Sequence, residues 1–250
     1  MIDVRDVSHS FVTRSGSERV TTKVFEGLSL EVPEVQFVSV VGASGCGKTT
    51  LLRMIAGLLE PESGEVRVQG DRVTAPDPSR PIVFQDSALY PWRTVEANVR
   101  LGLELSGLAT GAEARRVTDH HIDLVGLSEY RDHYPSQLSV GMRQRAGLAR
   151  ALAVRPPMLL LDEPFAALDA IGRHRLGGEL LRIWESERRT VVLVTHSLDE
   201  ALTLSDRVVL VRDGRVVSDT EVGLDRPRDV DAVIEDPHFR ELRSSLWNLL

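Results

Sequence analysis

The sequence is poor in cysteine, lysine and aromatic residues. Cys46 is its only cysteine, which excludes disulfide bonds within the chain and metal sites that need several thiolates. No apolar stretch approaches the roughly 20 residues needed to cross a bilayer, and the segment after Met1 lacks the basic and apolar parts of a signal peptide. We therefore expect a cytoplasmic protein.

The charge balance is acidic, with a formal net charge of −7. Proteins that bind nucleic acid through a general surface usually carry a basic patch that neutralises phosphates, so this balance disfavours such a surface. The seven histidines do not suggest a metal cluster, because the neighbours His120 and His121 would diverge on a helix, and we expect them to be surface residues. A hydrophobic content of 42% in 250 residues allows a large core.

Residues 42–50 read G-A-S-G-C-G-K-T-T and follow an apolar run, residues 36–41, that indicates a buried strand. A strand, a glycine-rich loop and a helix in this order are typical of a phosphate-binding loop. The glycines let backbone N–H groups surround an anion, and the helix that begins near Lys48 points its positive end at the same place. Lys48 would reach the terminal phosphates, and Thr49 would offer its hydroxyl to magnesium. The alternative is a glycine-rich turn without a ligand.

The hydrophobic pattern changes along the chain. Residues 1–41 alternate between apolar and polar, with loop signals at 15–17 and at Gly27, which predicts an antiparallel sheet that ends in the buried strand. Residues 65–69 continue this alternation of apolar and polar residues. Residues 93–155 instead show helical periodicity, which predicts an inserted helical lobe. Two continuous apolar runs, 158–161 and 191–194, predict parallel strands, and 208–217 predicts a hairpin that turns at Asp213-Gly214.

Polar residues follow the predicted buried strands, at the sheet edge where ligands bind in open parallel sheets. They are Gln85, the pair Asp162 and Glu163, and His196. Asp162 is suited to hold magnesium through water, and Glu163 is the candidate general base for the attacking water. Gln85 could sense the metal and that water, and His196 could hydrogen-bond the terminal phosphate. Each alone could be structural, but the set accompanies a phosphate loop.

A second anion-binding helix end is predicted at Ser139. The segment 138–145 reads L-S-V-G-M-R-Q-R, and Ser139 is a good N-cap for a helix that runs to about Ala153 and is stopped by Pro156-Pro157. The free N–H groups at the start of this helix would form the site.

Taken in order, these motifs resemble the nucleotide-binding subunit of ATP-binding cassette (ABC) transporters over essentially the whole chain. The motifs are the loop 42–50, Gln85, the signature 138–142, Asp162-Glu163, Ala167-Leu168-Asp169 and His196. The resemblance implies an α/β P-loop NTPase fold of the ABC ATPase type, with a mixed central sheet, an N-terminal antiparallel β subdomain and an inserted helical subdomain. It places the catalytic core in 1–86 and 156–222, the helical signature subdomain in 87–155 and a C-terminal extension with a helix in 223–250.

The resemblance also implies an ATPase that uses ATP and Mg²⁺. In that family the signature of one subunit closes on the nucleotide held by the other, so that two ATP molecules lie at a head-to-tail interface. This chain has one copy of each motif, which implies a homodimer or a pair with a homologous subunit. The implied catalytic residues are Lys48, Glu163 and His196; the magnesium residues are Thr49, Gln85 and Asp162; and the nucleotide-binding residues are Phe11, Gly42, Ser44, Gly45, Cys46, Gly47, Lys48, Thr49, Thr50, Gln85, Ser139, Gly141 and Asp169.

Two positions depart from the family pattern. Val140 stands where the family usually has glycine, and its branched side chain would crowd closure on the partner's phosphate or alter the backbone there. Phe11 stands where an aromatic residue, most often tyrosine, stacks on adenine. Phe11 either stacks on the base or fills the core.

Residues 86–99 are similar to the corresponding stretch of importers of nitrate, sulfonate, taurine and related small anions, and the tail 236–250 is similar as well and predicts a short amphipathic helix. The similarity implies a separate integral membrane permease, an indirect periplasmic or lipid-anchored substrate-binding protein, and a peripheral position on the inner face of the membrane. Tyr90 and Trp92 would contact a short helix of the permease; the alternative is that Trp92 packs within the helical lobe.

Two other functions compete with import. A soluble mechanical ATPase that acts on DNA or ribosomes is disfavoured by the compact size, the acidic balance and the lack of long coiled-coil inserts. A regulatory module whose hydrolysis is disabled by Val140 is disfavoured by the presence of Lys48, Asp162, Glu163 and His196.

Overall fold

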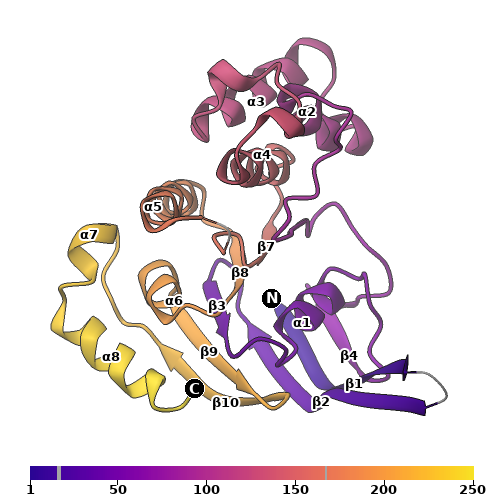
Figure 1. Cartoon of the computed structure of the whole chain (residues 1–250), viewed down its shortest axis with the longest axis vertical. Helices are drawn as coiled ribbons and strands as arrows, with labels where there is room; N and C mark the ends of the chain where they lie inside the picture. Colours follow the sequence, from indigo (N-terminus) through magenta and orange to yellow (C-terminus); the bar gives the residue numbers. More distant parts are fainter. Residues whose placement is uncertain (16–17, 167) are drawn as a thin grey trace. The chain divides into compact units, whose positions relative to one another are not determined.

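The computed structural model describes residues 1–15, 18–166 and 168–250 (Figure 1). Part of the predicted loop at 15–17 and the first residue of the Ala167–Asp169 motif therefore lie outside the described residues. Contacts divide the chain into two compact units, and each is considered by itself. The first unit comprises Met1–Asp77 with Glu187–Leu250, and the second comprises Pro78–Ser186. The predicted subdomain boundaries at 86/87 and 155/156 stay predictions.

The N-terminal part of the first unit is an antiparallel sheet, as the alternating pattern predicts. Its strands are β1 (Ile2–Ser15), β2 (Glu18–Val32), β4 (Ser63–Val68) and β5 (Asp71–Arg72), in the order β2-β1-β4-β5. The loop predicted at Gly27 is wrong, because β2 runs through this residue. Gly27 has φ +70° and its N–H donates to Ser8 Oγ at 3.0 Å. It lies where the register between β1 and β2 shifts, so the glycine allows the positive φ that this irregularity of the strand requires.

The first unit also contains a mixed sheet of buried strands. β3 (Phe37–Val41) lies between β8 (Thr190–Thr195) and β9 (Arg207–Arg212) and is parallel to both, while β10 (Arg215–Glu221) is antiparallel to β9 (Figure 1). The buried strand at 36–41 thus joins this sheet and does not end the antiparallel one, because it is apolar on both faces. The hairpin between β9 and β10 turns at Asp213 and Gly214, with φ +49° and +72°, as predicted.

Four helices complete the first unit within the described residues: α1 (Lys48–Ile55), α6 (Leu198–Leu204), α7 (Val230–Val233) and α8 (Pro237–Trp247). The amphipathic tail helix is confirmed as α8, which is capped by Asp236 and buries Phe239 and Leu246 in one cluster with α6. Among the described residues, no helix has the length and apolarity that a bilayer crossing requires.

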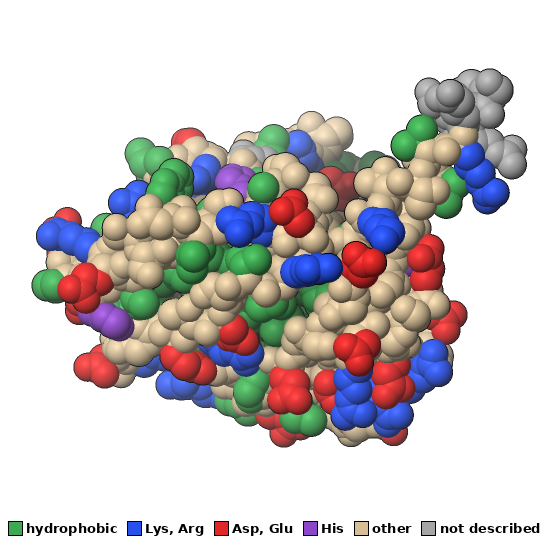
Figure 2. Space-filling view, turned by 90° about the horizontal axis from the view of Figure 1, so that it is seen from below, with side chains coloured by type: hydrophobic (Ala, Val, Ile, Leu, Met, Phe, Trp, Pro, Cys, Tyr) green, Lys and Arg blue, Asp and Glu red, His purple; other side chains and the backbone are tan. Residues whose placement is uncertain are grey.

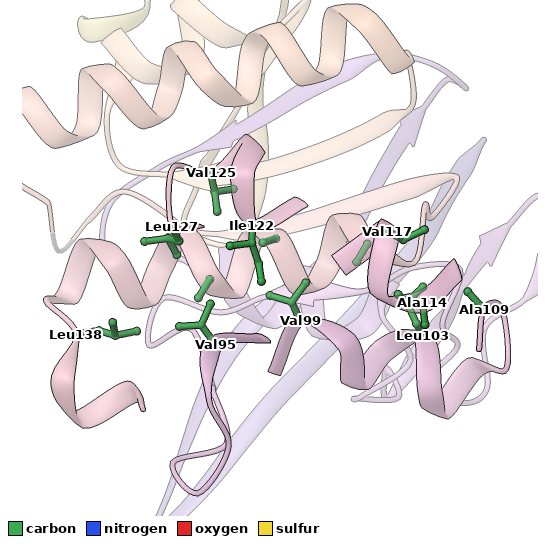
Figure 3. Close-up of a cluster of buried hydrophobic side chains, with 13 residues drawn as sticks. Val95, Val99, Leu103, Ala109, Ala114, Val117, Ile122, Val125, Leu127 and Leu138 are labelled. Atoms are coloured by element: carbon green, nitrogen blue, oxygen red, sulfur yellow. The ribbon is translucent and has the colours of Figure 1, made fainter. Parts of the chain in front are cut away.

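The second unit contains the helical lobe and two short parallel strands. The strands are β6 (Ile82–Val83) and β7 (Met158–Asp162), and the helices are α2 (Val95–Ser106), α3 (Gly111–Leu124), α4 (Val140–Ala153) and α5 (Ala170–Glu187), with single 3₁₀ turns at Ser128–Tyr130 and Pro135–Gln137. The helices predicted in 93–155 are confirmed. Their inner faces meet in one apolar cluster, to which Val95, Val99 and Leu103 contribute from successive turns of α2 (Figure 3).

One prediction fails in α3. His120 is exposed, but His121 is only 2% exposed and its Nδ1 lies 2.7 Å from the carbonyl oxygen of Val117. Adjacent residues on a helix lie about 100° apart, so one histidine faces solvent while the next faces the core side of α3. The expectation that the histidines are surface residues is wrong for His121, and it is also wrong for His9 on β1, which is buried.

Candidate functional site

The phosphate loop lies between β3 and α1, as predicted. Gly47 is the N-cap of α1 with φ +104°, and within this fully described loop the helix has neither a side-chain cap nor an acidic residue in its first turn. Backbone N–H groups at such a helix end are suited to bind an anion. The side chain of Lys48 is 5% exposed, and its Nζ donates to the carbonyl oxygens of Gly42 at 2.7 Å and Ala43 at 3.0 Å. The ammonium group thus lies within the loop itself.

Close packing fixes the loop backbone. A Cβ atom on Gly47 would lie 2.6 Å from two ring carbons of Phe25, and one on Gly42 would lie 2.2 Å from the carbonyl oxygen of Val211. Only glycine allows these approaches. The other predicted loop residues differ in exposure: Ser44 and Gly45 are exposed, Cys46 and Thr49 are half-buried, and Thr50 is buried.

His196 lies at the same sheet edge as the phosphate loop. Val41 at the end of β3 pairs with Thr195 at the end of β8, and the two strands are parallel, so Gly42 and His196 leave neighbouring strand ends. His196 is exposed. Its turn is fixed by Thr195 Oγ1, which donates to Glu200 Oε2 at 2.5 Å and accepts from Ser197 N–H at 3.0 Å.

Phe11 lies on β1 in the same unit. Its side chain is 41% exposed, which contradicts the alternative that Phe11 fills the core. Its ring meets the ring of His9 edge to face, with the centroids 4.9 Å apart. An exposed aromatic ring held from one side is suited to stack on a planar base.

In the second unit, the strand ends bring Gln85 to the same edge as Asp162 and Glu163. Val83 of β6 pairs with Leu161 of the parallel strand β7, so the residues that follow both strands emerge side by side. The carboxylate of Asp162 is buried at 5% exposure, Glu163 is half-buried and Gln85 is exposed. Glu163 has φ +45°, a left-handed conformation that is rare for a non-glycine residue and is found at functional sites.

The signature segment begins α4 as predicted. Ser139 is the N-cap, and its Oγ accepts from Met142 N–H at 3.3 Å. Val140 is 42% exposed at this helix start. A Cβ atom on Gly141 would lie 2.7 Å from Leu168 Cδ2, so the glycine lets the signature pack against the loop that carries Asp169. Both segments line one pocket of about 460 Å³.

The Asp169 carboxylate accepts a hydrogen bond from the backbone. Its Oδ1 accepts from Gly172 N–H at 2.7 Å, which caps the start of α5. The structure thus groups the predicted residues by unit: the phosphate loop, His196 and Phe11 lie in the first, and Gln85, Asp162, Glu163, Asp169 and the signature lie in the second.

Sequence reasoning missed Asn98, which organises the loop before α2. Its side chain is fully buried; Oδ1 accepts from Tyr90 N–H at 2.8 Å, and Nδ2 lies 2.9–3.2 Å from the carbonyl oxygens of Tyr90, Arg93 and Thr94. The loop therefore presents Trp92 in a fixed conformation, with the side chain 69% exposed. This exposure contradicts the alternative that Trp92 packs within the helical lobe. The signal available in the sequence was an asparagine beside Val95 and Val99 on an apolar helix face.

A groove of about 420 Å³ lies beside this loop in the second unit. Its walls include Pro81, Ala88, Tyr90, Leu101 and Leu105. Leu105 is 77% exposed and Tyr90 is 40% exposed. Apolar side chains that line a groove and face solvent mark a surface for a partner of similar character.

Comparison with known proteins adds a family match. A model described as "ABC transporter" matches residues 25–166. The chain is 46% identical to the nitrate import ATP-binding protein NrtD of Synechococcus elongatus over 230 residues, which cover 90% of this chain and 84% of that protein. It is 43% identical to the bicarbonate transport ATP-binding protein CmpD of Synechocystis sp. over 253 residues, which cover 100% of this chain and 88% of the relative.

Two solved structures have a similar fold. One is the dimeric post-hydrolysis state of the ATP-binding cassette MJ0796 bound to ADP and Pi, with a TM-score of 0.79, 30% identity and coverage of 90% of this chain and 100% of the other. The second is the dimeric structure of MJ0796 described as a bacterial ABC transporter cassette, with a TM-score of 0.80, 31% identity and the same coverage.

Proposed function

The chain belongs to the ABC transporter family, and from this premise we propose that it is the ATP-hydrolysing subunit of an importer of a small anion. The observation that carries the proposal is the phosphate loop: a helix end without a side-chain cap, with the buried Lys48 ammonium held inside the loop. Such a loop suits a polyphosphate ligand. The anion is inferred from the relatives, because two of them are named for nitrate import and bicarbonate transport.

Lys48 and the loop N–H groups bind the phosphates of ATP, and the ring of Phe11 stacks on the adenine base. The exposed side chain of Phe11 supports this role. Ser44, Gly45, Cys46 and Gly47 contribute backbone N–H groups around the phosphates. Thr50 is buried in the first turn of α1, directly after the loop.

Magnesium suits the oxygen donors present, which are the Thr49 hydroxyl and the buried Asp162 carboxylate. The described residues contain no group of three His, Cys, Asp or Glu side chains that could hold an ion by themselves. Magnesium usually binds through one or two carboxylates together with substrate phosphates, so this composition is compatible with it. When bound, the ion neutralises negative charge on the phosphates.

Hydrolysis needs a water that is oriented toward the terminal phosphate. We assign Glu163 as the base that takes a proton from this water, Gln85 as the amide that senses the water and the metal, and His196 as a hydrogen-bond partner of the terminal phosphate. Gln85 and Glu163 emerge from neighbouring strand ends in the second unit, and His196 emerges beside the phosphate loop in the first. Positioning and charge stabilisation of this kind supply most of the catalysis of phosphoryl transfer.

The site is completed by a second subunit in this proposal. Ser139 and Gly141 at the start of α4 contact the phosphates held by the partner, and Asp169 lies next to them on the wall of the same pocket. One chain carries one phosphate loop and one signature, so two chains form two sites. The partner is a second copy or a homologous subunit, and both solved neighbours are dimeric structures.

A membrane permease is the proposed partner of the Tyr90–Trp92 loop. Trp92 and Tyr90 project together, with ring centroids 5.4 Å apart, beside the apolar groove. A short helix on the inner side of the permease would bury these rings, and large aromatic side chains of this kind often dominate binding energy. The subunit is thus peripheral on the inner face of the membrane, and the substrate-binding protein acts on it only through the permease.

The competing functions have less support. Acidic and basic side chains are interspersed over the face drawn in Figure 2, whereas a nucleic-acid machine needs a contiguous basic surface. For a regulatory module, the complete set of Lys48, Asp162, Glu163 and His196 would have no use.

The test is affinity purification of the tagged chain from native membranes, combined with phosphate release from ATP. The proposal expects a co-purifying integral membrane permease, and it expects Glu163→Gln to keep ATP affinity while losing turnover. Lys48→Ala should abolish ATP binding in calorimetry. Trp92→Ala should lower the recovery of the permease without affecting phosphate release by the isolated chain. Co-purification with ribosomes or DNA only, or a Glu163→Gln rate equal to wild type, would contradict the assignment.

A further inference from the structure

The signature helix α4 holds the segment that follows Gln85. Gln144 Nε2 donates to the carbonyl oxygen of Gln85 at 3.3 Å. One turn further on, Gly147 faces Ser87: a Cβ atom at Gly147 would lie 3.1 Å from Ser87 Cβ and 3.2 Å from its carbonyl oxygen. The missing side chain therefore lets the segment approach the helix closely.

Arg150 makes the third and strongest contact from α4. Its Nη1 donates to the carbonyl oxygen of Ala88 at 2.8 Å, and its Nη2 donates to that of Ser87 at 3.0 Å. Burial lowers the pKa of the Arg150 guanidinium, but arginine remains charged in proteins. A charged group in a partly desolvated place needs hydrogen-bond acceptors, and these two carbonyl oxygens supply them.

The two residues that Arg150 holds have an unfavourable backbone conformation. Ser87 has φ +59° and Ala88 has φ +42°, both in the left-handed region that non-glycine residues rarely adopt. Ser87 is also buried, and its N–H donates to the carbonyl oxygen of Phe84 at 2.9 Å. Strained residues of this kind persist only where surrounding contacts fix them, and they occur at functional sites. The two bonds from Arg150 go to the carbonyls of these same two residues.

We infer that Arg150 is a positioning residue that holds the segment after Gln85, residues 86–88, in its strained conformation and connects this segment to the signature helix α4. A displacement of α4 at its Ser139 end is then passed to Gln85 through Gln144 and Arg150. Ala88 and Arg150 also line the apolar groove, so a partner segment bound in this groove would contact both residues of the Arg150–Ala88 hydrogen bond. The inference rests on the proposed role of Gln85 in hydrolysis.

Arg150→Met tests this role, because methionine keeps much of the side-chain volume but removes both donors. We expect kcat for ATP hydrolysis to fall about tenfold, equivalent to about 1.4 kcal/mol in the barrier, while the Kd for ATP changes less than twofold, because the phosphate loop binds the nucleotide. Arg150→Lys, which keeps one donor group, should give an intermediate rate. Ala88→Gly should restore most of the activity of Arg150→Met, because glycine adopts a positive φ without strain.

A double-mutant cycle separates positioning from a general loss of stability. In the Gln85→Ala background, Arg150→Met should lower kcat no further, because both changes remove the same function. Arg145→Met is the matched control: Arg145 lies on the same helix and donates to a backbone carbonyl, that of Val125, at 3.0 Å. Its effect should combine additively with Gln85→Ala. Full additivity for Arg150→Met, or failure of Ala88→Gly to restore the rate, would overturn the inference.

Amide hydrogen exchange of residues 85–90 tests the connection between α4 and this segment independently of the proposed function. Arg150→Met should raise exchange in this segment, whereas Arg145→Met should not. Unchanged exchange would refute the connection even in an active ATPase. Raised exchange in a protein whose Gln85→Ala variant hydrolyses ATP normally would support the connection and would instead refute the role of Gln85.

Discussion

Replacement of Asn98 tests how the Tyr90–Trp92 loop is held. The buried amide bonds both to N–H and to carbonyl groups of this loop. Two of these groups keep a backbone partner in Asn98→Ala, because the Tyr90 carbonyl accepts from Arg93 N–H and the Thr94 carbonyl accepts from the N–H of residue 98. The Tyr90 N–H and the Arg93 carbonyl keep no other hydrogen bond that is recorded within the described residues.

The magnitude follows from these two groups. An unsatisfied buried polar group costs about 1–3 kcal/mol, so the two groups together should lower the stability of Asn98→Ala by about 2–6 kcal/mol. For a chain of this size, each kcal/mol lowers Tm by about 2–4 °C, so the expected fall is about 4–24 °C. The matched control is Asn248→Ala, which changes the other asparagine, an exposed residue at the end of α8. Its effect should stay within about 0.5 kcal/mol.

Asn98→Asp gives the sharper comparison. The aspartate keeps the acceptor for Tyr90 N–H but turns its second oxygen toward the carbonyl oxygens, and burial disfavours its charged form. The folded-state pKa is therefore raised above the unfolded value of about 3.9. Below this value the stability of the variant should approach that of wild type, and it should fall as the pH rises through the folded pKa.

Thermal unfolding by circular dichroism at pH 4 and pH 7 is the assay. At pH 7 the Asp variant should be less stable than Asn98→Ala, and at pH 4 the difference should shrink or reverse. An Ala variant as stable as the Asn248→Ala control, or an Asp variant whose deficit does not depend on pH, would refute the hydrogen-bonding argument. ATP affinity should stay unchanged in both, since Asn98 lies outside the phosphate loop.

Three further changes test the nucleotide site. Gly47→Ala places a Cβ atom 2.6 Å from the Phe25 ring at a φ of +104° and should weaken ATP binding in calorimetry at least about tenfold; Gly70→Ala, also at positive φ but with open space around it, should leave binding intact. In the proposed site Cys46 adjoins the phosphates, so ATP should slow its alkylation, and equal rates with and without ATP would contradict this placement. Val140→Gly should hydrolyse ATP as fast as wild type or faster; a large loss would show that valine is adapted to the site.

Local signals made much of the fold predictable. The apolar runs predicted the buried strands β3, β7 and β8, and the cap Ser139 predicted where α4 begins. These signals work because burial on both faces and N-cap hydrogen bonding depend on residues close in sequence. The failures at Gly27 and His121 arose where tertiary pairing or helix orientation decides the outcome.

The supporting residues of the site were not predictable in the same way. Gln144 and Arg150 hold a segment that precedes them by about 60 positions, and no local pattern marks these side chains as partners for distant carbonyls. Asn98 binds a loop within eight residues of it, and only its place on an apolar helix face gave a signal. The phosphate loop was predictable because strand, glycines, lysine and helix are contiguous. The exposure of Phe11 and Trp92 required the fold, since aromatic residues occur both in cores and at binding surfaces.

In the proposed dimer two subunits enclose each ATP, with the phosphate loop from one and the signature from the other. Light scattering of purified Glu163→Gln with ATP and magnesium tests it most directly, because a variant that binds but does not hydrolyse ATP should accumulate the closed state. We expect a mass of twice the 27.7 kDa of one chain, which should return to that of a single chain when Ser139 is also replaced by arginine. A mass of one chain at saturating ATP would contradict it.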